Sequence, residues 1–194
     1  MTDADRAAAT DGLTGRLREV VLARGVRAVA TYRAVGSEPQ TGPFVAWALA
    51  EGLRVLLPVS RQDGLLDWAL AGGEERMGTH GAAEPGAVGE RLGLHGIPEP
   101  VGERLGPDAL SGVDLLLAPA AAVGPDGARL GWGRGYFDRA LGTARRRPPV
   151  LAVVFDTEFG AAVPREPHDQ PVDGVVTPTR TVLFGSGGSR STGP

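Results

Sequence analysis

The segment with the clearest potential for chemistry is 127–139, which reads GARLGWGRGYFDR and follows the apolar stretch 113–119. Three glycines at alternate positions, Gly131, Gly133 and Gly135, stand between charged side chains. Glycine lets successive backbone N–H groups converge on an anion, and arginine supplies forked donors for phosphate oxygens. The segment therefore predicts a phosphate-binding loop, and the alternative is an ordinary strand-to-helix turn.

Three neighbouring features of this segment suit a nucleotide and a metal ion. A helix is expected to begin near Gly135, with its free N–H groups and the positive end of its dipole directed at the glycines. Asp138 follows in the first turn, where a carboxylate can face a Mg2+ ion that bridges phosphates. Tyr136 and Phe137 offer rings that can cover a flat ligand.

A second polar cluster, PHDQPVD, spans 167–173. Asp169 is a candidate oxygen ligand for the same Mg2+ ion, because this ion takes one or two carboxylates in addition to substrate phosphates. We expect a structural role for His168. The alternative for the whole cluster is a turn in which the aspartates cap nearby backbone groups.

A third candidate is Glu38, which lies in the sequence SEPQT after the first apolar strand. A carboxylate at the end of a strand can accept hydrogen bonds from amine or amide groups of a ligand. The alternative is an acid that is simply solvated in a surface loop.

The composition excludes several kinds of chemistry. All 20 basic residues are arginine, and there is no cysteine. The chain therefore has no lysine for a Gly-Lys-Ser/Thr phosphate loop or a Schiff base, and no thiolate nucleophile, thiolate metal ligand or disulfide. The net charge of −3 gives no electrostatic reason to expect nucleic acid as a partner. No apolar run is long enough to cross a membrane and no signal peptide is visible, so we expect a cytoplasmic protein without a membrane partner.

Short apolar stretches that alternate with helical patterns must position these residues. Strands are predicted over 26–33, 53–59, 65–70, 113–118, 150–155 and 172–177, and helices over 3–24, 41–51 and 136–146. Continuous apolar strands separated by helices favour a mostly parallel sheet that is covered on both faces. We therefore predict a Rossmann-like α/β fold with three α/β/α layers, in which ligands bind beyond the carboxyl ends of the strands.

With 194 residues, 42% of them hydrophobic, the chain is expected to form a single domain over 1–184. The Gly- and Ser-rich end, 185–194, is expected to be a disordered tail. No internal repeat is evident in the sequence.

Several segments together resemble the 5-formyltetrahydrofolate cyclo-ligase family, also called methenyltetrahydrofolate synthetases. They are DLLLAP, GARLGWGRGYFDR and PHDQPVDGVVTP, with SEPQT and LRVLLPV, so that the similarity covers roughly 26–180. The Arg-Leu-Gly start, the alternating glycines, the Tyr-aromatic-Asp-Arg ending and the downstream His-Asp form a specific combination.

The resemblance implies an ATP-dependent ring closure. In that family MgATP phosphorylates the formyl oxygen of 5-formyltetrahydrofolate, N10 attacks the activated carbon, and phosphate leaves to give 5,10-methenyltetrahydrofolate and ADP. No protein nucleophile is needed, so positioning and charge stabilisation would carry the catalysis. The implied partners are the folate substrate and ATP as co-substrate, with Mg2+ as cofactor, and we expect a monomer.

The resemblance also assigns roles to residues by position. Asp138 and Asp169 would hold Mg2+, and Arg134 and Tyr136 would be the catalytic residues. ATP would be bound by Arg129, Leu130, Gly131, Trp132, Gly133, Arg134, Gly135, Tyr136 and Phe137. The folate would be bound by Glu38, Arg33, Trp132, Gly133, Arg134, Gly135 and Tyr136.

One departure from the family pattern leaves alternatives open. Family members usually carry an N-terminal helix in which a Lys and an Arg four residues later contact ATP phosphates, and this sequence has no lysine for it. Arg6, Arg16 and Arg18 are candidates for the missing cation. A non-catalytic folate- or nucleotide-binding protein is therefore the alternative function. A sugar-phosphate isomerase or acyl-CoA enzyme with the same layers ranks last, because the lysine or placed glutamate of such enzymes is not found.

Overall fold

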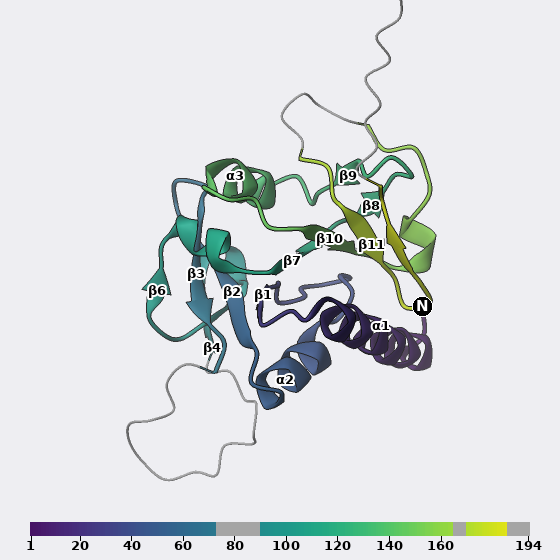
Figure 1. The fold of residues 1–194 in the computed structure, drawn as a ribbon, viewed down its shortest axis with the longest axis horizontal. Coiled ribbons are helices and arrows are strands. Elements are labelled where there is room, and N and C mark those ends of the chain that lie inside the picture. Colours follow the sequence, from purple (N-terminus) through teal and green to yellow (C-terminus); the bar gives the residue numbers. More distant parts are fainter. Residues whose placement is uncertain (73–89, 165–169, 186–194) are drawn as a thin grey trace, which may run out of the picture.

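A computed structural model describes residues 1–72, 90–164 and 170–185 of the chain (Figure 1). The predicted metal ligand Asp169, its neighbour His168 and all but the first residue of the predicted tail lie outside these ranges.

The centre of the described structure is a sheet of eight strands in the order β12-β11-β10-β7-β1-β2-β3-β6. The five strands from β11 to β2 pair in parallel, and β12, β3 and β6 add antiparallel edges. Their bounds are β1 Ala28–Ala30, β2 Arg54–Ser60, β3 Leu66–Leu70, β6 Arg104–Leu105, β7 Leu115–Pro119, β10 Val150–Val153, β11 Gly174–Val176 and β12 Thr181–Leu183. Two small antiparallel pairs lie outside this sheet, β4 Glu90–Leu92 with β5 Pro98–Pro100 and β8 Ala122–Val123 with β9 Arg129–Leu130.

Helices cover both faces of the sheet (Figure 1). The helices α1 (Asp3–Arg24) and α2 (Gly42–Ala50) pack on one face, and α3 (Tyr136–Thr143) packs on the other with the 3-10 helix η2 (Pro107–Gly112). Alternate residues of β7 divide accordingly, because Leu115 and Leu117 join the core under α1 and α2, whereas Leu116 and Ala118 join the core under α3. The predicted three-layer, mostly parallel α/β fold is thus confirmed.

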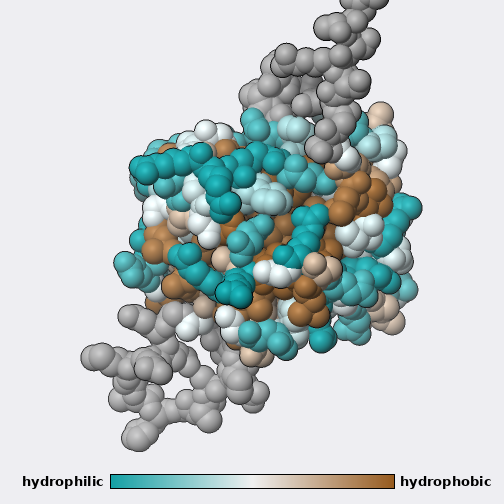
Figure 2. Space-filling model, viewed as in Figure 1, coloured by the Kyte–Doolittle hydropathy of each residue, from teal (hydrophilic) through white to brown (hydrophobic). Residues whose placement is uncertain are grey.

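The two faces of α3 differ in polarity. The helix buries Ala140 and Leu141 against the sheet, and hydrophilic residues gather over it on the solvent side (Figure 2). Two further 3-10 turns, η1 (Leu94–Gly96) and η3 (Asp156–Glu158), complete the described elements. No helix in the described part of the chain combines the length and apolar character of a membrane span.

Two predicted elements end three residues before their sequence patterns do. The first strand ends at Ala30 rather than at residue 33, and the chain then turns away because the Thr41 hydroxyl donates to the Tyr32 carbonyl at 2.7 Å. The third helix ends at Thr143 rather than at residue 146. There the backbone N–H of Arg145 donates to the Asp108 carboxylate at 3.2 Å, which draws the chain out of the helical path.

Candidate active site

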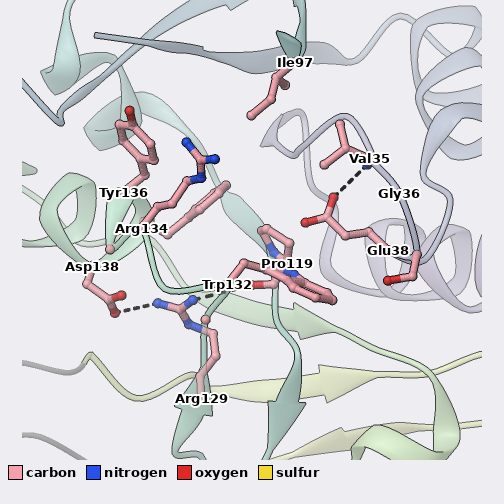
Figure 3. Close-up of a pocket in the computed structure, with 14 residues that line it drawn as sticks. Val35, Gly36, Glu38, Ile97, Pro119, Arg129, Trp132, Arg134, Tyr136 and Asp138 are labelled. Atoms are coloured by element: carbon pink, nitrogen blue, oxygen red, sulfur yellow. Dashed lines mark hydrogen bonds and ion pairs between the residues drawn. The ribbon is translucent and has the colours of Figure 1, made fainter. Parts of the chain in front are cut away.

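A pocket of about 360 Å³ opens beyond the carboxyl ends of β1 and β7 (Figure 3). One wall is the loop 35–38, which follows β1, and the opposite wall is formed by Arg129 and by residues of the segment 131–138, which lead into α3. Ile97 and Pro119 complete the lining. Parallel strands deliver their following loops to one edge of the sheet, so residues far apart in sequence meet here.

The wall made by the glycine-rich segment, residues 127–139, is held by an ion pair between two residues near its ends. The Arg129 Nη2 atom lies 2.5 Å from the Asp138 Oδ1 atom, and the Arg129 side chain is only 3% exposed. Arg129 Nη1 also donates to the carbonyl oxygen of Pro119 at 3.4 Å. Because a buried guanidinium needs a counter-charge, Arg129 fixes the position of the Asp138 carboxylate on the pocket wall.

The backbone of this wall depends on Gly135. This residue is the N-cap of α3 and adopts a φ of +61°, a left-handed conformation that glycine takes without steric cost. The first turn of α3 then begins at Tyr136, which lines the pocket together with Phe137 and Asp138. The free N–H groups of that turn favour an anionic ligand at this end of the helix.

Glu38 lies on the opposite wall and is nearly buried (Figure 3). Its Oε2 atom accepts a hydrogen bond from the Val35 N–H at 2.9 Å, and its own N–H donates to the Val35 carbonyl at 3.1 Å. The Tyr32 hydroxyl closes the loop from inside the core by donating to the Pro39 carbonyl at 2.8 Å. Burial raises the pKa of the Glu38 carboxyl, and the Val35 hydrogen bond opposes that shift. The site therefore presents a positioned acid with little access to bulk water.

The structure brings most of the predicted site residues together. Those that line the pocket are Glu38, Arg129, Gly131, Trp132, Arg134, Gly135, Tyr136, Phe137 and Asp138. Arg33, Leu130 and Gly133 belong to the same loops but do not line it. Asp169 lies outside the described residues.

The candidate cations of α1 are directed elsewhere. Arg16 pairs with Glu19 at 2.7 Å, and the Arg18 guanidinium lies 5.0 Å from the ring centroid of Trp47. Neither of them, nor Arg6, lines the pocket. Within the described residues, the cations at the pocket are Arg129 and Arg134, both from the glycine-rich segment.

Sequence reasoning missed several lining residues: Val35, Gly36, Ser37, Ile97 and Pro119. Pro119 ends β7 and could have been found from the rule that ligands bind at the carboxyl ends of strands. Ile97 follows η1, in a region with no periodic pattern, and no sequence signal places it here.

The donor set at the pocket fits a nucleotide with Mg2+. No group of three or more His, Asp or Glu side chains able to hold a metal by themselves occurs among the described residues. A single carboxylate, Asp138, stands beside the N-terminus of α3. Mg2+ commonly combines one or two carboxylates with substrate phosphates, so this arrangement suits an ion that arrives with phosphates.

Comparison of the sequence with known proteins gives consistent matches. The chain is 39% identical over 158 residues to a 5-formyltetrahydrofolate cyclo-ligase from Mycolicibacterium smegmatis, covering 81% of this chain and 76% of that protein. It is 30% identical over 153 residues to a 5-formyltetrahydrofolate cyclo-ligase from Escherichia coli, covering 78% of each.

Solved structures show the same fold. The 5,10-methenyltetrahydrofolate synthetase of Aquifex aeolicus superposes with a TM-score of 0.72 at 24% identity, over 94% of this chain and 84% of that one. The synthetase of Mycoplasma pneumoniae gives a TM-score of 0.66 at 16% identity, over 92% of this chain and 90% of that one. The sequence model of one family matches residues 1–178. The chain thus belongs to the 5-formyltetrahydrofolate cyclo-ligase family.

Proposed function

We propose that this protein uses ATP and Mg2+ to convert 5-formyltetrahydrofolate to 5,10-methenyltetrahydrofolate, with release of ADP and phosphate. Family membership and the identity to the Mycolicibacterium smegmatis cyclo-ligase support the activity. The observation that carries the site assignment is that Glu38 and the glycine-rich segment face each other across one pocket (Figure 3).

The phosphates of ATP are assigned to the wall formed by the segment 131–138. Backbone N–H groups near the α3 N-terminus and the Arg134 side chain supply positive charge there. Arg129 already forms an ion pair with Asp138 and a hydrogen bond to the Pro119 carbonyl. Its role in ATP binding is therefore to fix the position of this wall rather than to contact the phosphates. Mg2+ bound by Asp138 and Asp169 would neutralise charge on the phosphates.

The folate is assigned to the space between Glu38 and the aromatic side chains of the opposite wall. Glu38 can accept hydrogen bonds from amine or amide N–H groups of the ligand. Trp132, which is 49% exposed, and Tyr136 offer ring faces for a flat heterocycle. The two substrates would then meet at Arg134 and Tyr136, which line the pocket between them.

The proposed reaction has two steps. The formyl oxygen attacks the γ-phosphorus of ATP, the bond to the bridging oxygen breaks, and ADP leaves. N10 of the folate then attacks the activated formyl carbon, inorganic phosphate departs with the former formyl oxygen, and N10 gives its proton to water. Arg134 would stabilise the charge on the transferred phosphoryl group, because its guanidinium stands at that wall.

The experiment is a spectrophotometric assay of methenyltetrahydrofolate formation by the purified protein. Product should form only when ATP, Mg2+ and 5-formyltetrahydrofolate are all present. Omission of any one is the control, and absence of product at saturating concentrations of all three would contradict the proposal. We also propose that the protein acts as a monomer, to be checked by sedimentation.

A further inference from the structure

Arg139 ends the glycine-rich segment but does not line the pocket. Its Nε atom donates to the carbonyl oxygen of Gly64 at 2.8 Å, and its Nη2 atom donates to the carbonyl oxygen of Arg134 at 2.6 Å. Gly64 belongs to the turn between β2 and β3, 75 residues away in sequence, whereas Arg134 belongs to the pocket wall. One guanidinium therefore ties the pocket wall to a distant turn of the sheet.

The same guanidinium contacts a second residue of the pocket wall. The Arg139 Cζ atom lies 5.4 Å from the ring centroid of Tyr136, within the range of an attractive cation–π contact. Arg134 and Tyr136 are the two residues assigned to the meeting point of the substrates. Arg139 holds the backbone of the first and the ring of the second.

The two glycines that flank the guanidinium leave the space for it. An added Cβ would lie 3.1 Å from Arg139 Nη2 at Gly64 and 2.8 Å from Arg139 Nη1 at Gly135. Both glycines adopt positive φ angles, +81° and +61°. The backbone on either side thus leaves room for the Arg139 side chain, and the contact joins two separate parts of the chain, the β2–β3 turn and the stretch 134–139.

We propose that Arg139 is a positioning residue that pre-orders Arg134 and Tyr136 for the nucleotide, with the β2–β3 turn as its support. The identity of the nucleotide as ATP rests on the proposed function. A wall ordered before binding loses less conformational entropy when the ligand arrives. The planar fork of arginine reaches two carbonyl groups at once, which the single ammonium of lysine does in a less fixed geometry.

The first test measures the affinity of a non-hydrolysable ATP analogue with Mg2+ by calorimetry. Arg139→Gln should weaken binding about tenfold, because it removes charged hydrogen bonds and the cation–π contact. Arg139→Lys should retain part of the affinity. The control is Arg145→Gln, which also removes a positive charge from an exposed arginine near the end of α3, but one whose side chain pairs with Asp108, outside the pocket, and it should bind as the wild type does.

The second test approaches the same contact from the other side. Gly64→Ala places a methyl group against the guanidinium, whereas Gly52→Ala, at a φ of +75°, meets no atom within 4 Å. Both substitutions carry a similar backbone cost, so both should lower the melting temperature. Only Gly64→Ala should also weaken binding of the analogue.

A third measurement is independent of turnover and reports on the wall itself. Trp132 is exposed in the glycine-rich segment, whereas Trp68 is buried and Trp47 is half-buried. Acrylamide quenching of tryptophan fluorescence without nucleotide should increase in Arg139→Gln and Gly64→Ala, and should be unchanged in Arg145→Gln.

These outcomes separate the inference from the proposed function. If the wild type forms no methenyl product but both variants show greater quenching, the reaction is wrong and the positioning role stands. If quenching and analogue affinity in Arg139→Gln equal those of the wild type, the positioning role is wrong whatever the activity.

Discussion

The side chains of Arg129 and Asp138 meet at 2.5 Å and close the glycine-rich segment into a loop whose two ends, nine residues apart, hold each other. The guanidinium is buried, whereas the carboxylate is 19% exposed and faces the pocket. The acid proposed as a metal ligand thus serves first as the counter-ion of a buried cation. This double role leads to predictions for stability as well as for catalysis.

Asp138→Asn should separate these two roles. The asparagine oxygen can still accept a hydrogen bond from Arg129, so the protein should fold, but the lost carboxylate charge should lower turnover about 100-fold. Asp138→Ala leaves the buried Arg129 guanidinium without its counter-charge, although the Pro119 carbonyl still accepts from Nη1, and should cost about 3 kcal/mol of stability. Initial rates and thermal unfolding measure the two effects. Wild-type turnover in the asparagine variant would remove Asp138 from the metal site.

Mg2+ binding should depend on the nucleotide. With Arg129 bound to the Asp138 carboxylate, Mg2+ alone should bind weakly, because the ion meets a neighbouring positive charge. Phosphates supply further oxygen ligands and negative charge, so a bound ATP analogue should raise Mg2+ affinity by about tenfold or more. Calorimetric titration of Mg2+ with and without the analogue measures this coupling. Equal affinity in both titrations would contradict it, and Asp138→Asn should abolish it.

Glu38→Gln should stabilise the folded protein above the pKa of the Glu38 carboxyl and should lower its activity. Because burial raises the pKa of the Glu38 carboxyl in the folded protein, this group favours folding most below its unfolded pKa, and the contribution is lost as pH rises through its folded pKa. The glutamine side chain does not ionise, so its contribution to stability does not fall as pH rises. Its amide oxygen can still accept the hydrogen bond from the Val35 N–H. Its melting temperature should therefore exceed that of the wild type at about pH 8, and the difference should shrink towards about pH 4.

The same substitution should impair the folate side of the reaction. Loss of a charged acceptor should lower kcat/KM for 5-formyltetrahydrofolate by about tenfold to 100-fold, while the affinity for the ATP analogue stays unchanged. In the wild type, kcat/KM should fall with acid at a higher pH than for an ordinary glutamate, since burial raises the pKa of Glu38. An equal loss of affinity for the ATP analogue in Glu38→Gln would indicate a general disturbance of the pocket instead.

The layers of this fold could be predicted because its elements bury continuous apolar residues. The strand predicted over 113–118 includes all of β7 (Leu115–Pro119) except its last residue. The helical spacing of Leu13, Leu17 and Val20 identified α1 although the helix contains two glycines. The strand-end rule also placed Glu38 and the glycine-rich segment at one edge of the sheet.

The details that could not be predicted depend on tertiary contacts. Threonine before a helix commonly caps it through its side chain. The Thr41 hydroxyl instead donates to the Tyr32 carbonyl and makes no capping hydrogen bond to the N-terminus of α2. Arg129 is a typical phosphate contact by sequence, yet it is buried against Asp138. Ile97 reaches the pocket through the position of the β4–β5 pair, which no local pattern specifies.

The two glycines of α1 provide a test of how this helix packs. Gly15 has no atom within 4 Å of an added Cβ, so Gly15→Ala should stabilise the protein by about 0.5–1 kcal/mol through helix propensity. At Gly12 an added Cβ would lie 2.6 Å from the carbonyl oxygen of Pro178, a backbone atom that cannot rotate away. Gly12→Ala should therefore destabilise the protein by about 1–3 kcal/mol, as overpacking does. Urea denaturation of the matched pair measures both effects. Equal stabilisation by both alanines would contradict the close packing of α1 against Pro178, in the turn between β11 and β12.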